Sequence, residues 1–296
     1  MEEGKMFLKR LFSTVVLLGV FSAVIFSPSP WNNIAFFLLS VLLTYTLVME
    51  ICGIVKNLGM ETFKHLTSLF CVLIVIVANL EYFLVDSDLT SVLYNILLFA
   101  IAIGCPIFIL FSKNSGEKIK KMFNSMAISI FVLIPVLLIV GIFISGIEAS
   151  DPTHNFNSYF LVFILLTKIG DIGAYVVGTI SNKLMKNGNH KMIPSISPSK
   201  SWEGAAGGLI FTLLLAFGFH CWIPELVVVE TVPLTIIMGS CMFFGSMGGD
   251  LMESALKRAA GVKDSGNAIP GIGGVFDLVD SLFVTAPVAA VIFASI

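Results

Sequence analysis

Charged residues are scarce in this chain, and their scarcity is the first constraint on its class. Asp, Glu, Lys and Arg make up 12% of the 296 residues, and apolar residues make up 57%. In typical soluble domains about 25% of the residues are charged and roughly 45–50% are apolar. The mean hydropathy of +0.98 therefore excludes an ordinary soluble domain and predicts an integral membrane protein. A net charge of −2 without a basic tail gives no reason to expect a nucleic-acid partner.

Cysteine and histidine are also few and lack metal-binding spacing. The five cysteines form no C-x-x-C pair, and each lies in or beside an apolar run. We therefore expect buried apolar thiols and neither disulfides nor zinc ligands. The four histidines form no H-E-x-x-H pattern, which disfavours a zinc hydrolase.

Apolar runs long enough to cross a bilayer recur along the chain. A spanning helix needs roughly 20 mostly apolar residues. The candidates are residues 8–26, 34–55, 66–85, 92–111, 126–147, 158–180, 205–222, 233–252 and 278–296. The predicted fold class is all-α, a polytopic membrane protein with about nine transmembrane helices. The first run could also be a signal peptide, but its length and the lack of a small-x-small site favour retention.

Basic residues segregate between alternate connections. Sixteen of the seventeen Lys and Arg residues lie at the N-terminus or in the even-numbered connections between these runs. Cytoplasmic loops are enriched in Lys and Arg. The pattern therefore places the N-terminus in the cytoplasm and the C-terminus outside.

Polar chemistry is concentrated in the second half of the chain, so we divide it into a scaffold, residues 1–157, and a catalytic region, residues 158–296. Lys168 and Asp171 lie inside a predicted spanning helix, three residues apart and so on one face. Charges at that depth are costly and need a partner or a wet cavity. The alternatives are a structural ion pair and the coupling site of a secondary transporter, although most of the charge lies in the cytoplasmic connections.

The connection after that helix carries the run "SPSKSWEG", residues 197–204. Pro194 and Pro198 exclude a regular helix through its middle. Lys200 is suited to an anionic phosphate, with a serine on either side. Ser201 can also cap the following helix, with Glu203 in its first turn.

The segment 249–282 holds the densest group of charges. Read as helix, Asp250, Ser254, Lys257 and Arg258 fall on one side. A turn-rich loop with Pro270 and several glycines follows. Beyond it, two aspartates three residues apart share a face at the start of the last span. Carboxylates suit Mg²⁺, basic residues suit phosphate, and the combination indicates chemistry on a nucleotide or phospholipid.

These residues resemble the phosphatidate cytidylyltransferase (CDP-diacylglycerol synthase) family. Its signature reads S-x-x-K-R-x₄-K-D-x₅-P-G-x-G-G-x-x-D-x-x-D. The matching residues are Ser254, Lys257, Arg258, Lys263, Asp264, Pro270, Gly271, Gly273, Gly274, Asp277 and Asp280. Two segments upstream, 171–178 and 197–204, also look like family features. The family commonly has His and Arg where this chain has Ile272 and Leu278, so no role of that His or Arg is carried over.

The resemblance implies a Mg²⁺-dependent reaction of CTP with phosphatidic acid that gives CDP-diacylglycerol and pyrophosphate. It also implies a bacterial cytoplasmic membrane, an active site on the cytoplasmic face and a homodimer; a second cation is left open. A cytidylyltransferase for another lipid phosphate, of the ether-lipid type, is the nearest alternative. The expected metal ligands are Asp171, Asp250, Asp264, Asp277 and Asp280, and the expected catalytic residues are Lys257, Asp264, Asp277 and Asp280. Substrate contacts are expected from Lys200, Ser201, Ser254, Lys257, Arg258, Lys263, Gly271, Gly273 and Gly274.

Overall fold

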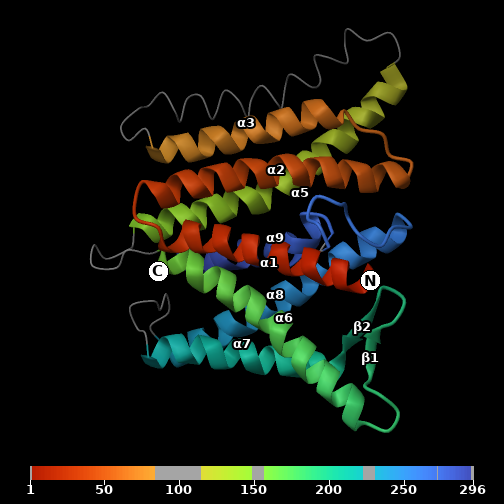
Figure 1. Cartoon of the computed structure of the whole chain (residues 1–296). Coiled ribbons are helices and arrows are strands. Elements are labelled where there is room, and N and C mark those ends of the chain that lie inside the picture. Colours follow the sequence, from red (N-terminus) through yellow and green to blue (C-terminus); the bar gives the residue numbers. More distant parts are fainter. Residues whose placement is uncertain (1, 84–114, 149–156, 223–230, 272, 295–296) are drawn as a thin grey trace. The chain divides into compact units, whose positions relative to one another are not determined.

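The computed structural model describes residues 2–83, 115–148, 157–222, 231–271 and 273–294. Within these ranges the chain is helical apart from one short hairpin and the connecting loops (Figure 1). The elements are α1 (Glu2–Phe26), α2 (Trp31–Asn57), α3 (Lys64–Phe83), α5 (Ser115–Glu148), α6 (Ser158–Leu184), β1 (Lys191–Ile193), β2 (Ser197–Ser201), α7 (Trp202–Trp222), α8 (Val232–Ala259) and α9 (Phe276–Ala294). The predicted all-α class is confirmed.

The apolar runs of the sequence become long helices. Among the described residues, six helices, α2 and α5 to α9, are long and apolar enough to cross a membrane, which identifies an integral membrane protein. The apolar parts of α1 and α3, Phe12–Phe26 and Lys64–Leu80, are shorter. The span predicted at 92–111 lies outside the described residues. The placement of each terminus relative to the membrane remains a prediction.

Several helices extend beyond the apolar runs that predicted them. Helix α5 begins at Ser115 rather than at 126, and α8 continues to Ala259 rather than ending near 252. The added turns carry polar and charged side chains, which hydropathy does not score as membrane. Backbone hydrogen bonding continues through them because no proline or glycine pair interrupts the helix there.

The chain forms two compact units. The first contains Met1–Val140 and Ala259–Asp277, and the second contains Gly141–Arg258 and Leu278–Ile296. In the first unit, α2 contacts both α1 and α3 and lies between them in Figure 1. Its core includes Leu47, Ile51 and Ile74, whereas Leu38 and Leu42 are exposed, as expected for side chains that face lipid. The division of the chain at residue 157 remains a prediction.

The second unit depends on close contact between α6 and α7. Gly207 and Gly208 on α7 face Val177 and Gly170 on α6, and a Cβ at either position would collide with them. Small residues allow helix backbones to approach closely, which is the main route to tight packing among apolar helices. Helix α6 begins where Asn157 caps it, because the Asn157 Oδ1 accepts a bond of 3.0 Å from the backbone N–H of Phe160.

A two-stranded antiparallel hairpin connects α6 to α7. Its register pairs Lys191 with Ser201 and Ile193 with Ser197. The sequence predicted a loop here because its prolines forbid a helix. Extended backbone tolerates Pro198, which lies in a strand that has one neighbour and therefore an open edge. The hairpin places Lys200 and Ser201 directly before the first turn of α7.

Substitution of Gly208 by alanine should loosen the α6–α7 contact. The added Cβ would lie 2.7 Å from the carbonyl oxygen of Gly170 and 2.6 Å from the ring of Phe243. Overpacking of this kind costs about 1–3 kcal/mol, so the purified protein in detergent should melt at a lower temperature. Gly53→Ala on α2 is the matched control because nothing lies within 4 Å of its Cβ position. Equal melting of Gly208→Ala and the wild type would contradict the close packing.

Candidate active site

Three aspartates of the second unit form what we call the acidic cluster: Asp171 on α6, Asp250 on α8 and Asp280 on α9. The Asp280 and Asp171 carboxyl groups each lie close enough to that of Asp250 for their charges to interact. Asp280 is 8% exposed, and its Oδ1 accepts a bond of 2.6 Å from the backbone N–H of Ser281. Gly249 makes this proximity possible, because a side chain there would collide with the backbone of Asp280.

Lys168 connects the acidic cluster to α9. Its Nζ lies 3.8 Å from the Asp171 Oδ2, which confirms the pair predicted from their spacing. The same ammonium donates to the Ser281 hydroxyl at 2.6 Å and to the carbonyl of Leu278 at 3.1 Å, both on α9. On the opposite side, the Ser246 hydroxyl donates to the Asp171 Oδ1 at 3.0 Å. The pair therefore belongs to a wider polar network of α6, α8 and α9.

Lys200 approaches the acidic cluster from the hairpin. Its Nζ lies 3.0 Å from the Asp250 Oδ2 and donates to the carbonyl of Met247 at 3.3 Å. The sequence predicted that Lys200 would meet a phosphate. The charge of Lys200 is compensated by Asp250, and that ion pair connects the hairpin to α8.

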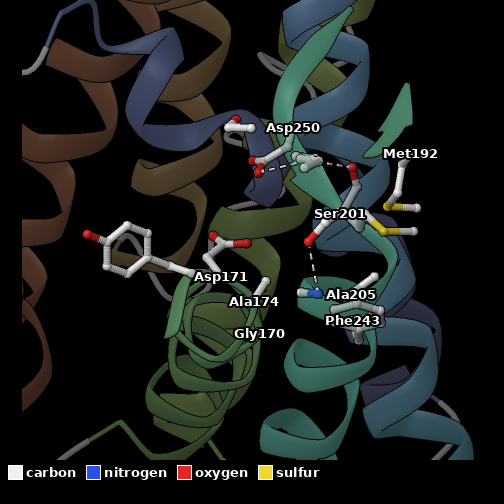
Figure 2. Close-up of a pocket in the computed structure, with 13 residues that line it drawn as sticks. Gly170, Asp171, Ala174, Met192, Ser201, Ala205, Phe243 and Asp250 are labelled. Carbon is white, nitrogen blue, oxygen red and sulfur yellow. Dashed lines mark hydrogen bonds and ion pairs between the residues drawn. The ribbon is translucent and has the colours of Figure 1, made fainter. Parts of the chain in front are cut away.

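A cavity of ≈ 190 Å³ opens beside the cluster, between α6, β2, α7 and α8. Its lining combines apolar side chains such as Phe243 and Met247 with the charged groups of Asp171, Lys200 and Asp250. Figure 2 shows the Asp171 and Asp250 carboxyl groups turned toward the same space, with Phe243 and Ala205 below them. The cavity therefore offers both a lysine and apolar side chains to an anionic, partly apolar molecule.

Ser201 has the capping role that the sequence indicated. Its hydroxyl accepts a bond of 3.1 Å from the backbone N–H of Gly204 in the first turn of α7. It also accepts a bond of 3.0 Å from the Asn189 side chain. Ser201 is 3% exposed although it borders the cavity, so substrate contact through this hydroxyl remains a prediction. Glu203 in the same turn binds His190, with 2.6 Å between Oε1 and Nδ1.

The loop between α8 and α9, residues 260–275, is called the signature loop below and belongs to the first unit. Asp277, in the first turn of α9, holds it: the Asp277 Oδ2 accepts from the backbone N–H of Gly274 at 2.7 Å and from the N–H of Ser265 at 3.0 Å. Ile269 and Gly273 exchange two backbone hydrogen bonds across the tip. On α1, the Ser13 hydroxyl donates to the carbonyl of Pro270 at 2.7 Å.

The glycines of the signature loop have positions that other residues would not tolerate. Gly271 has a φ of 79° and Gly273 a φ of 134°, conformations that L side chains rarely adopt. A Cβ at Gly273 would also lie 2.5 Å from the Asp277 Oδ2. These glycines therefore shape the loop around the Asp277 carboxylate, while substrate contact by their backbone remains a prediction.

One further carboxylate contacts this loop, and it was not predicted from the sequence. Glu50 on α2 accepts from the backbone N–H groups of Val275 and Phe276, each at 2.9 Å. A single acid near the end of an apolar helix is a weak signal, and its partners lie more than 200 residues away in the chain.

The remaining predicted residues lie along the end of α8 and in the signature loop. Lys257 forms an ion pair of 2.6 Å with Glu253, and both side chains are largely buried. Ser254 is half-buried, and Arg258, Lys263 and Asp264 are exposed. Their predicted roles in binding metal and substrate are not tested by this arrangement.

The predicted metal ligands fall into two groups. Asp171, Asp250 and Asp280 belong to the second unit, and Asp264 and Asp277 belong to the first. Among the described residues, no three His, Cys, Asp or Glu side chains meet closely enough to surround a metal ion by themselves. The adjacent Asp250 and Asp280 carboxyl groups are nevertheless suited to supply two ligands of a metal ion. Two adjacent carboxyl groups require a proton or a cation between them, and Mg²⁺ commonly takes one or two carboxylates and completes its shell with water and phosphate.

Comparison with known proteins adds an independent observation. Residues 8–296 match the model of a family described as the cytidylyltransferase family. A phosphatidate cytidylyltransferase of Haemophilus influenzae is 44% identical over 138 residues, which are 46% of this chain and 46% of that protein. A protein of the same name from Bacillus subtilis is 39% identical over 140 residues, 45% of this chain and 48% of that protein. One from Thermotoga maritima is 30% identical over 188 residues, 53% of this chain and 67% of that protein. The chain thus spans about half the length of the first two relatives.

Substitution of Ser201 by alanine should destabilise the start of α7. Loss of a serine cap typically costs about 0.5–2 kcal/mol, and the Asn189 side chain would also lose a partner. The melting temperature in detergent should fall. Ser199→Ala is the control, because Ser199 borders the same cavity but is exposed. If the two variants had the same melting temperature, Ser201 would not be the cap that stabilises this helix.

Proposed function

This chain belongs to the cytidylyltransferase family, and we propose that it transfers a cytidylyl group from CTP to phosphatidic acid. The products would be CDP-diacylglycerol, for phospholipid synthesis, and pyrophosphate. The observation that carries this proposal is the acidic cluster, with Lys168 and Lys200 beside it, at a cavity within a unit of apolar helices. The three relatives reported above are named for this reaction.

In the proposed reaction a phosphate oxygen of the lipid attacks the α-phosphorus of CTP. A new P–O bond forms as the bond from the α-phosphorus to the bridging oxygen breaks, and pyrophosphate leaves with that electron pair. The lipid phosphate is already a nucleophile, so no serine or cysteine intermediate is needed. The main obstacle is that both substrates are anionic and repel each other. Catalysis must therefore come from positioning and from fixed positive charge.

Asp250 and Asp280 are the residues that we propose to hold Mg²⁺, with Asp171 beside them. When bound, Mg²⁺ would neutralise phosphate charge and orient phosphate oxygens. The same carboxylates hold Lys168 and Lys200 in defined positions before substrate arrives. The ammonium of Lys200 borders the cavity and can offer a point charge to a phosphate.

The residues of the signature are proposed to bind the phosphates of the nucleotide and the metal ion. Lys257, Arg258 and Lys263 provide positive charge suited to phosphates, and Asp264 and Asp277 remain candidate metal ligands. The cytoplasmic orientation of the site, the bacterial inner membrane and the homodimer are part of the same proposal. They follow from the distribution of Lys and Arg and from the family resemblance.

The proposed activity predicts a Mg²⁺-dependent incorporation of label into lipid. Purified protein in detergent would receive CTP labelled in its cytidine, Mg²⁺ and phosphatidic acid, and the lipid-extractable label would be measured. We expect label in the lipid phase, and its loss when EDTA removes the metal. A parallel sample with an ether-linked lipid phosphate distinguishes the nearest alternative, since label in that sample alone would reassign the substrate. No label with either lipid would refute the activity.

Neutralising Asp280 should abolish both turnover and metal binding. Asp280→Asn removes one of two facing acids, so we expect activity to fall by at least about 100-fold. Mg²⁺ at roughly 100 times its Kd should stabilise the wild type by about 2.7 kcal/mol, and that thermal shift should vanish in the variant. Glu117→Gln, at an exposed position on α5, is the control. A variant that retained the Mg²⁺ shift would remove Asp280 from the metal site.

A further inference from the structure

We infer that Glu50 is a positioning residue for the signature loop and for the Asp277 carboxylate. It lies on α2, in the part of the chain that the sequence marks as scaffold. Its contacts are with the loop and with the start of α9, all within the first unit. The inference deepens the proposed function, on which its kinetic consequences rest.

Glu50 caps a helix that begins more than 220 residues later in the chain. The Glu50 Oε1 accepts from the N–H of Val275, and the Oε2 accepts from the N–H of Phe276, each at 2.9 Å. The first N–H groups of a helix have no partner within the helix, and they are usually satisfied by a nearby side chain. Here a neighbouring helix supplies a carboxylate, whose charge also suits the positive end of α9.

Ser265 links Glu50 to Asp277. Its hydroxyl lies 3.2 Å from the Glu50 Oε2 and 3.0 Å from the Asp277 Oδ2. The backbone N–H of Ser265 also donates to Asp277. Ser265 is 8% exposed, so the link is shielded from water. The position of Asp277 therefore depends on Glu50 through one shared hydroxyl and through the first turn of α9.

The loop leaves room for Glu50 at two glycines. A Cβ at Gly266 would lie 2.6 Å from the Glu50 Oε1, and one at Gly274 would lie 2.5 Å from the Oε2. Any side chain at these positions would displace the carboxylate. Gly274 is a position of the family signature, and in this structure it gives space to an acid from α2.

These contacts indicate that Glu50 positions the loop and does not itself contact the substrates. Both oxygens of Glu50 are engaged by groups of the chain itself, the backbone of α9 and the Ser265 hydroxyl. The residue therefore acts on substrates through the loop that it holds. Its removal should change the order of that loop, and with it the rate of the chemical step, more than the affinity for the lipid.

Hydrogen exchange measured by mass spectrometry tests the structural part directly. In Glu50→Gln the amide oxygen can still accept, but the NH₂ group faces an N–H donor and leaves it without a partner. Amides in peptides that cover residues 273–277 should exchange roughly tenfold faster than in the wild type. Glu61→Gln is the matched control, because Glu61 is an exposed acid in the same unit that pairs with Lys121. Its exchange in these peptides should equal that of the wild type.

Steady-state kinetics tests the catalytic part. Misplacement of reacting groups by a remote change can reduce rates by on the order of 100-fold, so kcat for Glu50→Gln should fall by roughly 10- to 100-fold. The KM for phosphatidic acid should stay within about twofold, because the lipid is not held by Glu50. Glu50→Asp keeps the charge and should recover part of the lost rate. Ser265→Ala breaks the shared link without touching Glu50, and it replaces Glu50→Gln in both measurements if that variant does not fold.

Unchanged exchange in residues 273–277 would overturn the inference, as would faster exchange spread evenly over the whole chain. Faster local exchange with an unchanged kcat would overturn the positioning role. If the wild-type protein showed no cytidylyl transfer, that result would refute the proposed function instead. In that case local exchange still decides whether Glu50 holds the loop, so the two failures are distinguishable.

Discussion

A carboxylate among apolar helices must have a partner, and this requirement organises the polar side chains of both units. Isolated burial of such a charge is costly. In the first unit the backbone N–H groups of the signature loop and of α9 satisfy Glu50 and Asp277. In the second unit Lys168 and Lys200 compensate Asp171 and Asp250. Each acid therefore fixes a segment of chain as well as carrying a charge.

The Asp250–Asp280 pair differs from these carboxylates because each of its two carboxyl groups lies beside another carboxyl group. Backbone groups and lysines surround the pair, but they do not separate the two carboxyl groups. A proton or a cation can resolve that repulsion, and a cation would also attract phosphate. The same electrostatic requirement that makes the pair unfavourable on its own thus makes it suited to a metal and an anionic substrate.

Much of this architecture could be predicted from residues close together in the sequence. Apolar runs predict the described helices, a spacing of three residues predicts the Lys168–Asp171 pair, and a serine before an apolar run predicts the Ser201 cap. Each of these depends on local geometry. The helix ends were less predictable, because hydropathy does not register the polar turns that continue α5 and α8.

Contacts between distant segments were not predictable from pattern. The spacing of Gly266 and Gly274 gives no sign that a carboxylate from α2 occupies the space beside them. The hairpin was also missed, because proline rules exclude a helix without selecting a strand register. The grouping of Asp250 with Asp280 requires the close approach at Gly249, and that approach exists only once α8 and α9 are packed.

The capping of α9 by Glu50 also has a consequence for how the chain is made. Ribosomes deliver α2 to the membrane before α9 exists, so the Glu50 carboxylate lacks its α9 partners until the last segment emerges. Once α9 has been made, the N–H groups at its start donate hydrogen bonds to the Glu50 carboxylate on α2. A chain that stopped short of α9 would leave that carboxylate without these two N–H donors, among helices where an unpartnered charge is costly.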